Sequence, residues 1–77
     1  MSKLPLLSAL ELCKFLEKQD FVAIRQKGSH RFYEHPDGRT TVVPIHSGKD
    51  IGRGLLNKIL DEIEMDRDEF IRIYYKK

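Results

Sequence analysis

The middle of the chain, residues 21–44, restricts the possible folds more than any other feature. It contains three runs rich in β-branched and aromatic residues, which span residues 21–26, 30–35 and 39–43. Each run has the length and composition of a β-strand, and turn signals separate them. At residues 36–38 the turn reads Pro-Asp-Gly: proline presets φ, aspartate bonds back to the backbone, and glycine accepts a positive φ. We therefore expect three short antiparallel strands joined by tight turns.

Amphipathic helix patterns lie on both sides of these strands. Ser8 and Glu11 match a capping box, in which each side chain bonds the other residue's amide, and apolar residues then recur at helical spacing. A second apolar stripe follows residue 54, and Asp66 is a typical N-cap for a short last helix. The expected helices cover residues 8–20, 53–63 and 67–74.

These elements predict an α+β fold in the order α-β-β-β-α, with a short C-terminal helix. The helices cover one face of a three-stranded antiparallel sheet, and the other face is open to solvent or to a partner. With 77 residues the chain has room for one core, so we expect a single domain over residues 1–77 and exclude Rossmann and barrel enzymes. Double-stranded-RNA-binding domains have the same order, although order alone assigns no function.

The single cysteine, Cys13, excludes an internal disulfide and a cysteine-based zinc cluster. It lies on the apolar stripe of the first helix, where we expect a small buried side chain rather than a nucleophile. We expect a cytoplasmic protein, because a small chain without disulfides suits a reducing compartment. Nothing at the N-terminus resembles a signal peptide, and no apolar run is long enough to span a membrane.

Positive charge is concentrated in the centre of the chain. Residues 21–58 carry seven Lys or Arg side chains against three Asp or Glu, a net charge of +4, while the whole chain has +2. All three histidines lie in the same block. A basic centre favours a polyanionic partner, but an asymmetry of this size is equally compatible with an ordinary solvated surface.

The segment Lys27–His30, with the sequence Lys-Gly-Ser-His, is the most informative chemical feature. Its histidine follows a Gly-Ser turn at the start of a strand and is flanked by Lys27, Arg25 and Arg31. Histidine suits proton transfer near neutral pH, and cations stabilise a charged phosphodiester transition state. By itself, however, the tetrapeptide is more typical of an exposed turn histidine without a function.

The other two histidines give weaker signals. His35 precedes a proline in the second turn, and we interpret it as a turn residue. His46 follows the last strand, and its place in the sequence leaves open whether it lies near His30 or caps a loop. The spacing of the three histidines matches no compact metal motif, so we expect no metal site.

Several of these segments together resemble the HicA toxin family, whose members are also described as YcfA-like messenger-RNA interferases. The resemblance extends from Leu7 to Phe70. It rests on Gln26–His30, His35–Arg39, Val42–Pro44 with His46, and the glycine-rich entry to Leu55–Leu60.

The resemblance implies a fold similar to a double-stranded-RNA-binding domain and cleavage of messenger RNA without a metal or a small-molecule cofactor. It implies that His30 is the catalytic histidine and that a HicB-type antitoxin covers it; no membrane is involved. We expect RNA to contact a basic region made of Lys27, Gly28, Ser29, Arg31, Lys49 and Arg53. His30 must act twice or share proton transfer with His46, Tyr33 or water. A non-catalytic RNA-binding module and a small protein-interaction domain are the alternatives.

Overall fold

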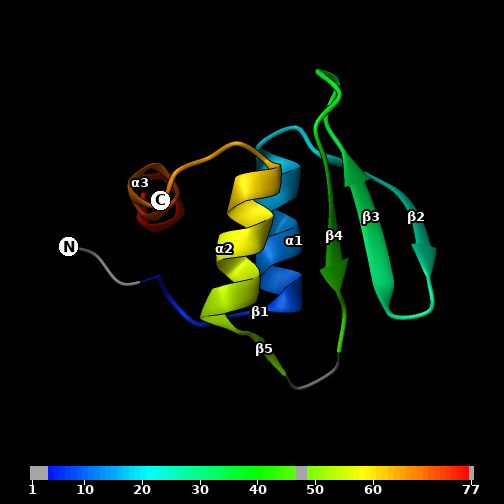
Figure 1. Ribbon diagram of the computed structural model, residues 1–77, viewed down its shortest axis with the longest axis horizontal. Coiled ribbons are helices and arrows are strands. Elements are labelled where there is room, and N and C mark those ends of the chain that lie inside the picture. The colour runs from blue at the N-terminus through cyan, green and yellow to red at the C-terminus, as the bar shows by residue number, and fades with distance from the viewer. Residues whose placement is uncertain (1–3, 47–48, 77) are drawn as a thin grey trace.

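In the computed structural model, which describes residues 4–46 and 49–76, the first helix begins where the capping box predicts (Figure 1). Helix α1 spans Ala9–Lys18. The Ser8 hydroxyl accepts from the Glu11 amide at 3.1 Å, and the Glu11 carboxylate accepts from the Ser8 amide at 2.7 Å. These two bonds satisfy amides that have no partner inside the helix, which is why it starts there.

The expected three-stranded antiparallel sheet is present, in the order β2-β3-β4. Its strands are Val22–Lys27 (β2), His30–Glu34 (β3) and Thr40–Pro44 (β4). Both predicted turns join them. Gly28 takes a φ of 59° and Gly38 a φ of 100°, and the Asp37 carboxylate accepts from the Arg39 amide at 3.1 Å. Glycine is favoured at both positions because other residues rarely adopt a positive φ.

Strand β2 is one of the two edge strands of the sheet and is exposed along its whole length. Its pairing with β3 shifts between Ala23 and Arg25, so Ile24 is the extra residue of a β-bulge. The expected strand is present, but the side chains of Val22 and Ile24 are 58% and 52% exposed. Their β-branched side chains therefore favour the extended backbone without being buried in the core.

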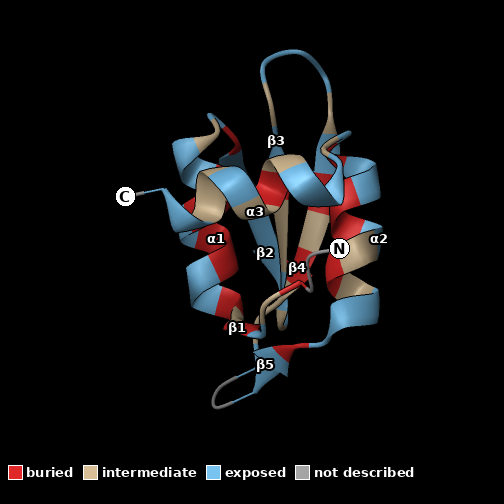
Figure 2. Ribbon diagram, turned by 90° about the vertical axis from the view of Figure 1, so that its left-hand side faces the viewer, coloured by how far each residue is buried: buried red, intermediate tan, exposed pale blue. Residues whose placement is uncertain are grey.

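All three expected helices are present and lie on one side of the sheet (Figures 1 and 2). Helices α1 and α2 (Arg53–Glu62) cover the sheet, and α3 (Arg67–Tyr75) lies on the side of α1 and α2 that is away from it. The Asp66 carboxylate accepts from the Glu69 amide at 2.8 Å, as its N-cap position predicts. No helix in the described part of the chain is long and apolar enough to cross a membrane.

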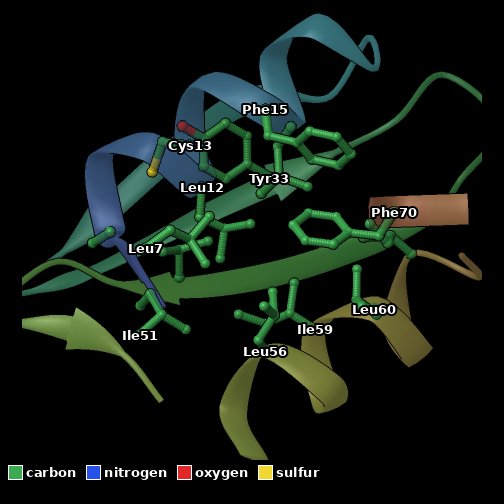
Figure 3. Close-up of a cluster of buried hydrophobic side chains, with 14 of the residues drawn as sticks. Leu7, Leu12, Cys13, Phe15, Tyr33, Ile51, Leu56, Ile59, Leu60 and Phe70 are labelled. Carbon is green, nitrogen blue, oxygen red and sulfur yellow. The ribbon is translucent and has the colours of Figure 1, made fainter. Parts of the chain in front are cut away.

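The core lies between the sheet and the helices (Figure 3). Tyr33 and Val43 enter it from the sheet, and the Phe15 and Phe70 rings pack edge to face with centroids 4.8 Å apart. Cys13 is buried in the same cluster, as expected from its place on the helix stripe. Because both apolar helix stripes and one face of the sheet meet here, the second face of the sheet is left without a helix.

One pairing was not predicted. Leu7–Ser8 (β1) and Asp50–Ile51 (β5) form a two-residue antiparallel ladder between the start of α1 and the glycine-rich connection. Leu7 and Ile51 are paired and both are buried. The glycine-rich connection before α2 is thus fixed to the core at this point, and residues 47–48 lie outside the described range.

Candidate functional site

The face of the sheet that carries no helix, called the open face below, is identified by the alternation of strand β3. Tyr33 is fully buried against the helices, and successive side chains of a strand point to opposite faces. His30, Phe32 and Glu34 therefore project from the open face.

Lys27 and His30 occupy opposed positions on either side of the Gly28–Ser29 turn. Opposed residues of an antiparallel ladder project from the same face, so the lysine and the histidine lie together on the open face. Both side chains are exposed. The Ser29 carbonyl accepts from the amide of Ile45, which ties the turn to the end of β4. The histidine is therefore presented to solvent on a turn held by a neighbouring segment.

Arg25 and Phe32 form the next opposed pair on the open face. The guanidinium carbon lies 4.7 Å from the centroid of the phenylalanine ring, a cation–π contact. We named Arg25 only as one of three cations around the turn and did not include it among the expected RNA-binding residues. The expected strand ended at residue 26, but β2 extends to Lys27. Arg25 and Lys27 are therefore two positions apart in one strand and share a face.

Arg31 lies on the other face of the sheet. Its Nε donates to the Gln26 side chain at 3.0 Å, and Gln26 is its opposed residue on β2. The nearby hydroxyl of Tyr33 raises the pKa of the Arg31 guanidinium. The structure therefore brings Lys27 and Arg25, rather than Lys27 and Arg31, to the same face as His30.

Lys49 and Arg53 come from the segment that leads into α2. Strand β5 and the start of α2 lie at the same end of the molecule as the turn between β2 and β3 (Figure 1). Both side chains belong to exposed residues, but the Arg53 Nε donates to the Leu4 carbonyl at 2.8 Å. Gly52 provides no side-chain cap, so the first amides of α2 have no side-chain acceptor there. Cations and helix amides thus gather at this end.

The two candidates for a second proton-transfer group are placed differently. Tyr33 is excluded by its position, since its hydroxyl donates to the Glu17 carboxylate at 2.8 Å on the helix-covered side. Burial, the largest cause, raises the pKa of this phenol. His46, in contrast, is exposed and follows Pro44, the residue opposed to His30 on β4. The amide of Ile45, the residue before His46, donates to the Ser29 carbonyl. The backbone of His46 therefore lies beside the Gly28–Ser29 turn.

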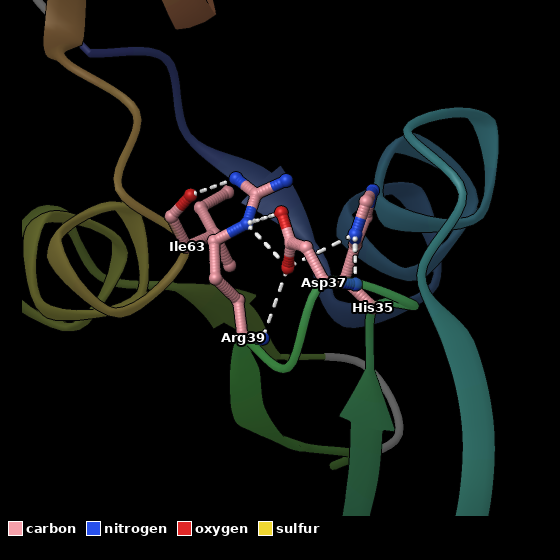
Figure 4. A network of polar contacts seen from close by, with 4 residues as sticks. All are labelled: His35, Asp37, Arg39 and Ile63. Atoms are coloured by element: carbon pink, nitrogen blue, oxygen red, sulfur yellow. Dashed lines mark hydrogen bonds and ion pairs between the residues drawn. The ribbon is translucent and has the colours of Figure 1, made fainter.

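His35 lies at the opposite end of the sheet, in a polar network around the second turn (Figure 4). Its Nδ1 is 3.1 Å from the Asp37 amide nitrogen, and its ring packs edge to face on Phe21 with centroids 5.0 Å apart. The Arg39 guanidinium binds the Asp37 carboxylate and donates to the Ile63 carbonyl. His35 is therefore a turn residue, as predicted. Within residues 4–46 and 49–76, no three His, Cys, Asp or Glu residues are grouped as metal ligands.

Comparison with known proteins identifies one family. The profile of a family described as HicA toxin of bacterial toxin–antitoxin systems matches residues 9–65, well over half of the chain. The match extends from α1 to the end of α2 and contains the whole sheet and both of its turns. A search of curated proteins gave no match.

Proposed function

Because the chain belongs to the HicA toxin family of bacterial toxin–antitoxin systems, we propose that it is an endoribonuclease that cleaves messenger RNA with His30 as the catalytic histidine. The pairing of Lys27 with His30 on the open face is the observation that supports this proposal most. It places a cation beside an exposed group that can transfer protons near neutral pH. Either residue alone would be an ordinary surface side chain.

The proposed reaction uses the nucleophile that RNA itself carries, its 2′-hydroxyl. His30 takes the proton of this hydroxyl, and the oxygen attacks the adjacent phosphorus. The bond from phosphorus to the 5′-oxygen then breaks, and that oxygen must receive a proton as it leaves. The products are a 2′,3′-cyclic phosphate and a free 5′-hydroxyl, so atoms and charges balance without another reactant.

The neighbouring residues supply charge and a second proton. Lys27, opposed to His30 on the open face, stabilises the negative charge that develops on the phosphate oxygens, and Arg25 adds positive charge to the same face. The Ser29 hydroxyl or the Gly28 and Ser29 amides add hydrogen bonds to one of these oxygens. His46, which follows the strand paired with His30, protonates the leaving 5′-oxygen.

The RNA backbone continues toward the start of α2. Lys49 and the N-terminus of α2, where Gly52 provides no side-chain cap, offer positive charge to the next phosphates. Arg31 and Arg53 already hold partners within the protein, so we assign them a smaller share of the RNA affinity. The expectation from sequence named Lys27, Arg31, Lys49 and Arg53 together and did not rank them.

Members of this family act with an antitoxin. We propose that a HicB-type antitoxin inhibits this protein by covering the open face around His30. An acidic surface on the antitoxin would complement Lys27 and Arg25 there, which speeds association and aligns the partners.

The test is cleavage of single-stranded RNA by the purified protein in EDTA, with the unaltered chain compared with His30→Ala. We expect His30→Ala to lose roughly 10²–10⁴-fold in rate. His35→Gln is the matched control, because His35 lies in the second turn and its replacement should leave cleavage unchanged. Binding of RNA without cleavage by the unaltered chain would identify a non-catalytic RNA-binding module instead.

A further inference from the structure

We propose that Arg25 and Phe32 together hold one nucleobase of the RNA, next to the phosphate that is cleaved. The inference rests on the proposed function and deepens it, because it names where the substrate is held beside the catalytic group. Its basis is the juxtaposition of two opposed pairs on the open face: Lys27 with His30, and Arg25 with Phe32.

The register of β2 and β3 places the two pairs next to each other. His30 and Phe32 are two positions apart on β3, so their backbone positions are separated by roughly 7 Å. A nucleoside whose phosphate lies at His30 therefore extends its base over the position of Phe32. No residue of α1, α2 or α3 covers this face, so the base can approach it from solvent.

The Arg25–Phe32 contact has the form of a stacking platform. The guanidinium carbon lies 4.7 Å from the centroid of the ring, and Phe32 is half-buried between Arg25 and its β4 neighbour Val42. Arginine planes and aromatic rings are the surfaces on which proteins stack the unpaired bases of RNA. Arg25 is exposed, so a base can stack on this pair while Lys27 binds a phosphate.

Binding a phosphate and stacking a base require different side-chain properties. This difference distinguishes the Arg25–Phe32 pair from a patch that binds RNA through charge alone. Charge alone attracts the backbone of any nucleic acid, and lysine satisfies it as well as arginine does. Stacking requires the flat guanidinium and the ring. Arg25→Lys therefore keeps the charge of the open face and removes the planar surface, and Phe32→Leu removes the ring while keeping an apolar side chain.

The experiment uses the full chain with His30→Ala, so that bound RNA stays intact. Short single-stranded RNAs carry the fluorescent base 2-aminopurine at one position each, because stacking quenches its emission. We expect quenching at one position next to the cleavage site. Adding Arg25→Lys or Phe32→Leu should abolish that quenching and weaken RNA binding by about 10-fold. The dependence of affinity on salt should stay the same for Arg25→Lys, because the charge is kept.

Matched controls lie on α3, across the molecule from the open face. Arg72→Lys repeats the arginine change and Tyr75→Leu removes another aromatic ring, both at exposed positions, and both should leave quenching and affinity as they are. Melting curves of each variant establish that it is folded before its binding is compared.

Three results would overturn the inference: no quenching at any position, unchanged quenching in Arg25→Lys and Phe32→Leu, or a loss of antitoxin affinity in these variants with RNA binding intact. The last result would show that Arg25 and Phe32 bind the antitoxin rather than RNA. Cleavage by the chain with His30 restored distinguishes the two proposals. If that chain does not cut RNA, the proposed function fails; if it cuts RNA equally well with Arg25→Lys, only the stacking site fails.

Discussion

Lys27 and His30 are opposed residues across a two-residue turn, and both project from the face of the sheet that no helix covers. His30 is exposed, so a substrate can reach it from solvent. The backbone around it is held by the bond between Ile45 and Ser29. Preorganisation of this kind is what a small enzyme requires, because it has few residues with which to enclose a site.

An RNA with 2′-deoxyribose at the cleaved position should resist the enzyme, because the proposed nucleophile is absent. The same substitution one nucleotide away should have little effect and is the control. Mass spectrometry of the products should find a 2′,3′-cyclic phosphate. Equal cleavage of the two substrates would mean that His30 activates water rather than the 2′-hydroxyl.

His46→Ala should slow cleavage by roughly 10²-fold or more, because the 5′-oxygen then leaves without a proton donor. An RNA with sulfur in place of that 5′-oxygen has a better leaving group that needs no proton. Its cleavage should be nearly the same for His46→Ala and the unaltered chain, while His30→Ala should stay slow on both substrates. If the sulfur substrate does not restore His46→Ala, another group or water donates the proton.

Lys49→Ala should weaken RNA binding and reduce the slope of log affinity against log salt by roughly 0.7, the value for one phosphate contact on a single strand. Arg53→Ala should change the slope less, because its guanidinium is bound to the Leu4 carbonyl, and should lower the melting temperature instead. Titrations at several salt concentrations measure both effects. The reverse ranking would show that Arg53 releases Leu4 to bind RNA.

Asp37→Asn should destabilise the protein at neutral pH but not in strong acid. Hydrogen bonds from Arg39, the largest cause, lower the pKa of the Asp37 carboxyl below 3.8. A carboxyl with a lowered folded-state pKa contributes stability above its unfolded pKa and loses it as the pH falls through the folded value. Urea unfolding at pH 7 and at successively lower pH measures the free energy of unfolding of both proteins. The difference between the two values should shrink as the pH falls. A constant difference would exclude the ion pair as its source.

Tyr33→Phe should cost about 1 kcal/mol at neutral pH, because it removes the hydroxyl that donates to Glu17. With Tyr33→Phe the free energy of unfolding should also fall less steeply at alkaline pH. Burial raises the pKa of Tyr33 above its ordinary value of 10.0, so the unaltered protein loses stability as the pH rises past that value, where the unfolded chain ionises first. The exposed Tyr75, replaced by phenylalanine, is the control and should leave the alkaline slope unchanged.

Local signals in the sequence were sufficient for most of the fold. The capping box at Ser8, the N-cap at Asp66 and the turns at Gly28 and Gly38 all depend on hydrogen bonds or φ values of neighbouring residues. Such features need no distant partner, so composition and spacing predict them. The ladder between Leu7 and Ile51 has no such signal. Two residues are too few for a periodic pattern, and their pairing depends on burial of both side chains in one core.

The sequence by itself predicted that His30 and Phe32 share a strand and that Arg25 belongs to the strand before it. The expected strand ended at residue 26, whereas β2 extends to Lys27 and so places Lys27 and Arg25 on one strand. Alternation of side chains then follows from the covalent geometry of an extended chain. Only the tertiary structure decided which face the helices cover, because packing of Tyr33 against α1 and α2 selects it. That choice leaves His30 with Lys27 and Arg25 on the open face and turns Arg31 away. It depends on contacts between residues far apart in the chain, which no local pattern contains.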